Sequence, residues 1–555
     1  MRIAFACLAA VTFTVPAFAQ FSNDASSNLV LADSGGEQVQ PKVRVAADGA
    51  IWYSWFDNAN GGYKPTVMCV NPRGFQLLPH NGVTLANTTN GSTVDYGLTT
   101  DAQGNALITF MDNSLGGSQV VTVHKISQDG VKLWGPNGVQ MIGSTGAANP
   151  KVASLSNGDV MVGWSVGGSF TLQRLASANG AIIGLPIPTI EVGHALTLSD
   201  LQPGDNGSVI ALWIRGFTTN FLSSKWLYAQ KWDTTGTAVW PVTPGLTAVG
   251  VYAPQPNVAP YGAQGGSVQN GYFPTMPPDG FGGVVVGWYE TAGTRNAYVQ
   301  HVRSNGEFRL PANGQPTGSA NIPGANIAIA GTAAYLAATD EIVLGWIETN
   351  AGSQSTNAIY AQKIAADNSV QWGGGAVVRT TADTSQPSFL KALPAGSGAF
   401  LTWINSAGGT DQNIRVQKLD AGGNAQFDEN GDTVCSAGGA KSRLDAALLP
   451  NGAIVTTFGT GASGSVDILT QPESLSRRLG PGACTDADVA ALGGALYSDE
   501  LLTADDVVGY LGAFFAGDLL HSDLAQLGGA RGPDGQLTPD DLVYFLSQFF
   551  AGCGF

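Results

Sequence analysis

Short apolar runs that end in an aromatic residue recur along most of the chain, separated by polar, glycine-rich turns. The clearest copy is the segment 341–375, where one apolar run ends at Trp346, a second carries Gln362, and Trp372 follows a turn. Equivalent aromatic positions lie 49 to 58 residues apart, except for one interval of 75, and such regular spacing is typical of repeat architectures. These positions are Trp55, Phe110, Trp164, Trp213, Trp288, Trp346, Trp403 and Phe458.

Each unit has room for about four short strands, which is the content of one β-propeller blade. A single blade cannot cover its own faces, so we interpret the tryptophans as core residues packed between blades. We predict a mainly β protein with an eight-bladed propeller over residues 20–471. Seven blades plus one irregular unit is the alternative, because one interval is lengthened by a segment around Val251 to Tyr272.

The two ends of the repeat array complement each other. The eighth unit stops after 465–471 without an outermost strand, whereas residues 28–33 resemble the outermost strand at 82–87. We expect the amino-terminal strand to complete the last blade, which would close the ring and remove exposed sheet edges.

The first 19 residues have the pattern of a signal peptide. Arg2 precedes an apolar run, and Ala17, Phe18 and Ala19 form a small-residue cleavage pattern. We therefore expect a secreted protein. No later segment is apolar for long enough to span a bilayer. A net charge of −16 argues against nucleic-acid binding, which needs clustered basic residues.

The composition changes after a predicted linker at 472–483, and the segment 484–555 contains a second duplication. The stretch beginning at Ala487 aligns without gaps on the stretch beginning at Ser522. Thr538 is a good helix N-cap, Pro539 suits the first helical position, and apolar residues then recur at helical spacing. We expect two similar helices that pack on one another.

The run from Asp534 to Asp541 is similar to the second half of an EF-hand-type calcium loop, and the whole duplication resembles a dockerin module, in the variant that ends in Gly552-Cys553. The resemblance implies calcium as a cofactor and a cohesin-like protein or cell-surface anchor as the partner. Glu500 stands where the loop glycine of the first repeat would be, so we expect a weaker site there; the acids could also be helix caps only. The implied ligands are Asp523, Asp534, Gln536, Thr538 and Asp541 in one repeat, and Asp488, Asp499, Leu501, Thr503 and Asp506 in the other.

Four cysteines remain after the signal peptide, and they allow three pairings. Cys484 and Cys553 bracket the duplication, so a bridge between them would clamp its ends and contribute about 4 kcal/mol on loop-entropy grounds. We expect Cys69 and Cys435 to be buried free thiols.

No catalytic motif stands out in the sequence. The letters at 163–167 match G-x-S-x-G, but Trp164 has the core position there and no helix follows. Polar residues two positions beyond the core aromatics could form a face that binds a sugar or a cation, or they could simply cap loops. These residues are Asp57, Asp112, Arg215, Glu290, Glu348 and Asn405.

The leading hypothesis from the sequence is therefore a secreted, non-catalytic binding or scaffold protein whose propeller recognises a polysaccharide or protein and whose tail anchors it. One alternative is a carbohydrate-active hydrolase or lyase, in which Glu290 and Glu348 could supply acid and base. A purely structural surface protein is the other alternative.

Overall fold

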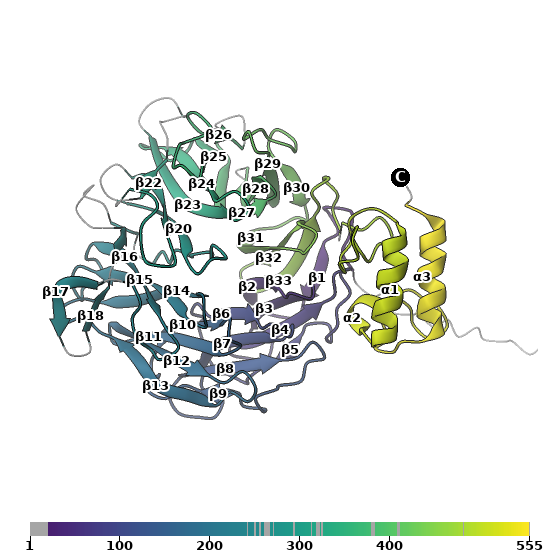
Figure 1. Cartoon of the computed structure of the whole chain (residues 1–555), viewed down its shortest axis with the longest axis horizontal. Coiled ribbons are helices and arrows are strands. Elements are labelled where there is room, and N and C mark those ends of the chain that lie inside the picture. Colours follow the sequence, from purple (N-terminus) through teal and green to yellow (C-terminus); the bar gives the residue numbers. More distant parts are fainter. Residues whose placement is uncertain are drawn as a thin grey trace, which may run out of the picture.

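The computed structural model shows eight antiparallel sheets arranged around a central axis, with a small helical domain at one side (Figure 1). The structure describes residues 20–553 except 241, 249–250, 255–256, 260–266, 270, 292–294, 312–313, 318–321, 323–325, 379–382, 408–410 and 481. The predicted signal peptide lies outside these residues. The eight-bladed propeller is confirmed.

In blades 1 to 4 the strand order follows the chain outward from the axis (Figure 1). Blade 1 comprises β2 (Gln38–Val45), β3 (Ile51–Asp57), β4 (Lys64–Val70) and β5 (Val83–Thr84); blade 2, β6 (Gly97–Thr100), β7 (Ala106–Asp112), β8 (Val120–Ile126) and β9 (Val139–Gln140); blade 3, β10 (Ala148–Ser154), β11 (Val160–Val166), β12 (Ser169–Leu175) and β13 (Ile182–Thr189); and blade 4, β14 (Leu196–Pro203), β15 (Val209–Gly216), β16 (Lys225–Trp232) and β19 (Asn257–Ala259).

The predicted insertion contains a separate two-stranded sheet of β17 (Val242–Ala248) and β18 (Val251–Pro254). Blade 5 follows it and is three-stranded. The remaining strands are β20 (Val284–Tyr289), β21 (Ala297–Val302) and β22 (Gln315–Pro316) in blade 5; β23 (Asn326–Leu336), β24 (Glu341–Asn350), β25 (Asn357–Ile364) and β26 (Ala376–Val377) in blade 6; β27 (Gln386–Ala395), β28 (Gly398–Ser406), β29 (Gln412–Leu419) and β30 (Asp432–Cys435) in blade 7; and β31 (Lys441–Leu448), β32 (Ile454–Ala462), β33 (Ser465–Glu473) and β1 (Leu29–Ala32) in blade 8.

Blade 8 closes the ring as the sequence predicts. Strand β1 pairs with β33, with Leu29 opposite Thr470 and Val30 opposite Leu469. The amino-terminal strand thus supplies the outermost strand that the eighth unit lacks, and the first and last parts of the propeller are held together by one sheet.

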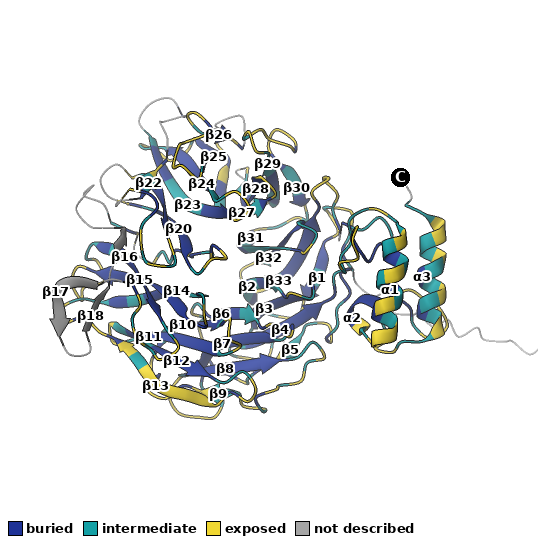
Figure 2. Ribbon diagram, viewed as in Figure 1, coloured by how far each residue is buried: buried dark blue, intermediate teal, exposed yellow. Residues whose placement is uncertain are grey.

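The repeated aromatic and glutamine residues have distinct structural roles. The core tryptophans, such as Trp213 and Trp346, are fully buried. Strands β15 and β24, which carry them, are drawn mostly in the colour of buried residues (Figure 2). The glutamine on the third strand binds the turn that leads to the fourth: Gln362 accepts a hydrogen bond from the Trp372 backbone N–H (2.8 Å) and donates one to the Gly373 carbonyl (2.9 Å). Because a buried amide must be satisfied, this residue fixes the outer turn of blade 6, and Gln230, Gln300 and Gln417 accept the equivalent hydrogen bond in blades 4, 5 and 7.

The carboxy-terminal domain contains α1 (Ala504–Ala516), α2 (Leu519–Ser522) and α3 (Pro539–Ala551). Helices α1 and α3 begin with the same capping box, Thr503 with Asp506 and Thr538 with Asp541. Their apolar faces meet where the rings of Tyr510 and Phe545 stack with centroids 4.0 Å apart. None of the described helices is long and apolar enough to cross a membrane.

The helical domain lies against the propeller. Arg73, in the turn after β4, donates from Nη2 to the carbonyl of His521 in α2 (2.9 Å), and this contact is buried. Leu520 belongs to the same apolar cluster as Phe21 near the start of the chain. The predicted linker also begins too early, because Pro472 and Glu473 are still paired with Val455 and Ile454 in blade 8.

Candidate functional site

The six polar residues predicted to form a face occupy equivalent places, at or near the end of the second strand of six blades. Within the described residues no hydrogen bond or ion pair joins any two of them. Several cap the following loop: Asp57 accepts a hydrogen bond from the Ala59 N–H (2.8 Å), and Asp112 accepts one from the Ser114 N–H (2.7 Å). Asn405 has a buried Oδ1 without a hydrogen-bond partner.

Arg215 contacts residues of its own blade and of the loop that precedes it. Its guanidinium forms a buried ion pair with Glu191 and lies 4.5 Å from the ring centroid of Trp226. These contacts stabilise the loop between blades 3 and 4 and leave Arg215 without a role shared with the other five residues.

Glu290 and Glu348 differ in their surroundings. Burial raises the pKa of Glu290 to about 7, and its Oε2 has no hydrogen-bond partner among the described residues. Glu348 accepts hydrogen bonds from the Ile322 N–H (2.6 Å) and from Trp346 Nε1 (3.4 Å). Glu290 therefore has a carboxyl group that holds its proton more tightly than usual, whereas Glu348 acts as a hydrogen-bond acceptor.

The innermost strands carry a repeated β-bulge that the sequence did not reveal. Strands β2, β10, β14, β23, β27 and β31 all shift register at equivalent points. In five of them a residue other than glycine has a left-handed φ of 50° to 57°: Gln40, Asn149, Ala330, Phe389 and Arg443. Such conformations are strained and often occur at binding sites.

Charged residues follow these bulges and meet across blades near the axis. Lys42 (blade 1) pairs with Asp95 (2.8 Å), and Lys151 (blade 3) pairs with the same carboxylate. Burial acts to raise the pKa of Asp95, but the charges of Lys151 and Lys42 outweigh burial and hold this pKa well below its usual range. In the same way Arg44 (3.0 Å) and Lys391 (3.3 Å) share Asp445.

A pocket of about 700 Å³ lies between blades 5 and 6 and brings together residues that are far apart in the sequence. His301 on β21 and Tyr335 near the end of β23 line it, together with Arg303 and Asp340. His301 Nε2 is 2.9 Å from Asp279 Oδ2, whereas Nδ1 is buried, 4.0 Å from Asp340 Oδ1, and has no hydrogen-bond partner in the part of the chain that the structure describes.

Asp279 holds the imidazole in one orientation. Its other oxygen accepts hydrogen bonds from the backbone N–H groups of Phe281 (2.7 Å) and Gly283 (2.8 Å). When Nε2 donates to Asp279, the lone pair of the neutral ring lies on Nδ1. Tyr335 donates to Asp340 (2.9 Å), and burial is the first cause that raises the pKa of its phenol. The pocket thus combines an oriented base, a protonated phenol and a guanidinium.

The Asp279–His301 pair occupies a position that holds an ion pair in other blades. The equivalent pairs are Asp101–Lys125, Asp159–Arg174, Asp205–Lys231 and Glu341–Lys363. Blade 5 alone among these has a histidine, which can be neutral at physiological pH. A signal was in the sequence, because His301 directly follows the repeat's Gln300, whereas Lys or Arg follows the glutamine in four of the five other units that have one.

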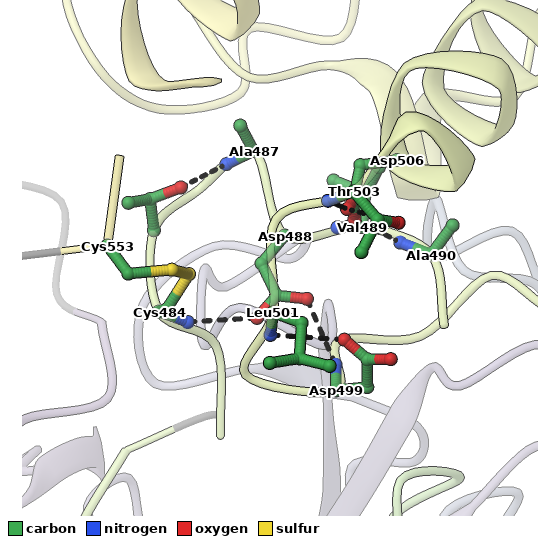
Figure 3. The surroundings of a disulfide bond; sticks show 11 residues. Cys484, Ala487, Asp488, Val489, Ala490, Asp499, Leu501, Thr503, Asp506 and Cys553 are labelled. Atoms are coloured by element: carbon green, nitrogen blue, oxygen red, sulfur yellow. Dashed lines mark hydrogen bonds between the residues drawn. A yellow bond between two sulfur atoms is a disulfide. The ribbon is translucent and has the colours of Figure 1, made fainter. Parts of the chain in front are cut away.

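In the helical domain the structure brings the predicted ligand acids of each repeat close together. Burial first, with contributions from the charges of Asp506 and Asp499, raises the pKa of Asp488 to about 7. Cys484 and Cys553 form the expected disulfide beside these loops (Figure 3), and Cys69 and Cys435 are buried and free. The loop conformation also repeats: Glu500 has a left-handed φ of 66° where Gly535 has 80°.

The acid oxygens of these loops face backbone N–H groups. Asp506 Oδ1 accepts from Val489 (2.8 Å) and Ala490 (2.9 Å), as Figure 3 shows, and Asp541 Oδ1 accepts from Leu524 and Ala525 (both 2.8 Å). Among the described residues, no group of three or more His, Cys, Asp or Glu side chains is arranged to hold a metal ion. A calcium ion would have to share or replace these hydrogen bonds.

No protein-family model and no curated protein matches this chain. Solved structures with a similar fold include a polysaccharide lyase described as an ulvan lyase (10% identity, TM-score 0.44, covering 80% of this chain and 97% of that one). A second polysaccharide lyase has 8% identity and a TM-score of 0.39, covering 78% and 88%. An α-L-arabinanase from Penicillium chrysogenum has 12% identity and a TM-score of 0.30, covering 58% and 92%.

The leading hypothesis of a non-catalytic binding or scaffold protein is corrected at this point. It depended on finding no catalytic constellation in the sequence, whereas the fold assembles His301, Tyr335 and Arg303 around one pocket. The similar structures named above are also carbohydrate-active enzymes, the class of the alternative hypothesis. At such low identity they indicate no particular reaction or residue for this chain.

Proposed function

We propose that the propeller is a polysaccharide-cleaving enzyme that acts by β-elimination on a chain containing uronic acid. The observation that carries this proposal is the pocket of about 700 Å³ in which an oriented imidazole, a phenol and a guanidinium meet. Elimination requires three functions: a base that removes the proton next to the carboxyl group, a cation that stabilises the resulting charge, and an acid that protonates the leaving oxygen.

Each function has a candidate residue in the pocket. His301 Nδ1 is the base, because Asp279 binds the opposite nitrogen. Arg303, whose side chain is 48% exposed and 3.7 Å from Asp340, can turn to a substrate carboxylate. Tyr335 is the acid, because its raised pKa keeps the proton on the phenol until the leaving oxygen develops charge.

The test uses the ion pairs of the other blades as a guide. The variant His301→Lys keeps a cation opposite Asp279, as Lys231 is opposite Asp205 in blade 4, but supplies no neutral base at physiological pH. Turnover of the wild type is first sought on uronate-containing polysaccharides by the ultraviolet absorbance of the unsaturated product. We expect His301→Lys and Tyr335→Phe to lower turnover by about 100-fold or more.

A matched control is His80→Lys, because His80 is an exposed histidine outside the pocket. This variant should retain full turnover. Full activity of His301→Lys would show that the pair with Asp279 only holds the blade together. Absence of an unsaturated product from every uronate-containing polysaccharide would contradict elimination itself.

A hydrolase is the second candidate, and one observation favours it. Glu290 has a pKa of about 7 because of burial, so it is partly protonated near neutral pH and could act as a general acid. Glu348 would be the second carboxylate of the pair. Hydrolysis releases reducing ends but gives no ultraviolet signal. If hydrolysis is the reaction, replacing both residues by Gln should abolish this release; if elimination is the reaction, the replacement should leave it unchanged.

We also propose that the helical domain binds calcium and attaches the protein to a cohesin-like partner or surface, and that the protein is exported by its first 19 residues. Support comes from the clustered acids and from apolar residues exposed at equivalent positions of the two repeats, Phe515 with Phe550 and Val508 with Val543. Asp523, Asp534, Thr538 and Asp541, with the Gln536 carbonyl, would hold the better-formed site; Asp488, Asp499, Thr503 and Asp506, with the Leu501 carbonyl, would hold the other.

Calorimetric titration of the full chain with calcium tests this proposal. The heat of the tighter binding step should be lost in the double variant Asp523→Asn, Asp534→Asn, and capture of a surface protein should require calcium and be reversed by a chelator. Equal heats for the wild type and the double variant would contradict the assignment of the second repeat. Export would be checked by finding the mature chain, beginning near Gln20, outside the cell.

A further inference from the structure

The charges near the propeller axis are not balanced. One carboxylate, Asp95, is shared by Lys42 and Lys151, and a second, Asp445, is shared by Arg44 and Lys391. Each group of three therefore has one positive charge in excess, in a chain whose formal net charge is −16. These cations come from blades 1, 3 and 7, so only the closed ring brings them together.

A small cavity adjoins the first group and reaches the second. Three cations line it, Lys42, Arg44 and Lys151, together with two carboxylates, Asp95 and Asp200, and with Tyr96, so the lining has one positive charge in excess; its volume is about 110 Å³. This volume has room for a carboxylate or sulfate group. Burial and the neighbouring charge of Lys151 act to lower the pKa of Lys42. An anion bound in the cavity would act to raise this pKa, because it favours the charged ammonium group.

The second group is open to a larger ligand. The side chains of Arg44 and Lys391 are 41% and 36% exposed. Phe389, two residues before Lys391, is also exposed and has a left-handed φ of 53°, which is unusual for a bulky residue. The guanidinium of Arg443, two residues before Asp445, lies 6.0 Å from the Phe389 ring centroid. An exposed aromatic ring beside guanidinium groups can stack on a sugar while the cations bind its acidic group.

We propose that the propeller axis is a binding site for an acidic saccharide, with its sulfate or carboxylate in the cavity at Lys42, Arg44 and Lys151 and a sugar ring on Phe389. This site uses none of the residues of the His301 pocket and goes beyond the proposed reaction. Tyr335 lies near the end of its strand, whereas Thr332, at the position equivalent to Lys42 and Lys391, lies three residues earlier. Binding at the axis and cleavage at the pocket can therefore be tested separately.

The simpler interpretation is that these ion pairs only join the blades. Blades 1 and 2 are linked by Lys42 with Asp95, and blades 8 and 1 by Asp445 with Arg44. Such a role predicts a change in the free energy of unfolding when a cation is removed, but no saccharide affinity in the wild type. Affinity, measured on variants that remain folded, separates the two interpretations.

Calorimetry with the full chain tests the proposal with four probes: chondroitin sulfate oligosaccharides, oligogalacturonate, neutral dextran oligosaccharides and sodium sulfate. We expect one or both acidic oligosaccharides to bind and dextran not to bind. Arg44→Gln should weaken binding by about tenfold or more, because a hydrogen bond to a charged group is lost. Phe389→Ala should weaken oligosaccharide binding without changing the unfolding temperature, since its side chain is exposed.

The matched control is Lys64→Gln, which removes one positive charge at the start of β4, away from the axis. It should bind like the wild type. A wild-type chain that binds acidic oligosaccharides but gives no unsaturated product would show that the proposed reaction had failed and this site had not. The proposal is overturned if dextran binds as well as the acidic chains, or if Arg44→Gln and Phe389→Ala both bind normally. It is also overturned if sodium sulfate binds as tightly as either oligosaccharide, which would indicate an inorganic anion site only.

Discussion

Leu29 lies opposite Thr470 in the sheet that closes the propeller, so the stability of the whole ring depends on a four-residue strand near the amino terminus. Leu31 in this strand is fully buried. Leu31→Ala should lower the free energy of unfolding by about 2 to 5 kcal/mol, measured by denaturant titration. The same substitution at Leu185, which is 87% exposed, is the control, and equal effects of the two would contradict the role of β1.

Two phenylalanines of α3 provide a matched pair for the helical domain. Phe545 is fully buried and stacks on Tyr510, whereas Phe550 is 80% exposed. Phe545→Ala should destabilise this domain by about 3 to 5 kcal/mol, and Phe550→Ala should change its stability little. Thermal unfolding followed by circular dichroism at helical wavelengths would measure both; a large effect of Phe550→Ala would place its ring in the core instead.

Docking of the helical domain depends on Arg73. Its Nη2 donates to the His521 carbonyl, and its side chain is buried. Arg73→Met should speed amide hydrogen exchange around Leu519–Ser522 while the propeller keeps its unfolding temperature, because the lost contact lies between the two domains. Lys132→Met, which removes a side-chain contact to the Leu85 carbonyl within the propeller, should leave this exchange unchanged. Slow exchange in Arg73→Met would mean that apolar contacts suffice for docking.

Stability should fall as the pH rises from about 4.5 to about 9 because of Glu473. Burial first, and then the charge of Asp432, raises its pKa to about 9 from a value near 4.5. A raised pKa in the folded state means that the stabilisation is complete below pH 4.5 and is lost as the pH rises towards 9. Glu473→Gln, which cannot ionise, should flatten the dependence of unfolding free energy on pH over this range. If the unfolding free energy of Glu473→Gln changed with pH as steeply as that of the wild type, the pH dependence would come from other groups.

The repeats were predictable because each is a local pattern. Within each pattern the residues are close together in the sequence. Examples are the apolar strand that contains Trp346, the glutamine that binds the next turn, and the capping box of Thr538 with Asp541. Their spacing predicted eight blades, the completing strand β1 and two similar helices. The disulfide between Cys484 and Cys553 followed from their places at the two ends of the duplication.

The candidate sites were not predictable in this way. His301 departs from the Lys or Arg of other repeats, but nothing in the sequence relates it to Tyr335 until blades 5 and 6 place both around one pocket. Of the polar face expected from Asp57 to Asn405, Asp57 and Asp112 bind their own loops, and whether the six residues act together stays a prediction. Lys42, Asp95 and Lys151 belong to three different units, so no local pattern relates them.

The sequence by itself determined the repeating unit, the closure of the ring and the helical duplication, because strand period, turn residues and helix caps act over short distances along the chain. Only the tertiary structure decided which polar side chains meet. That outcome depends on bulges in the inner strands and on the packing of one blade against the next, which bring residues from separate repeats into contact.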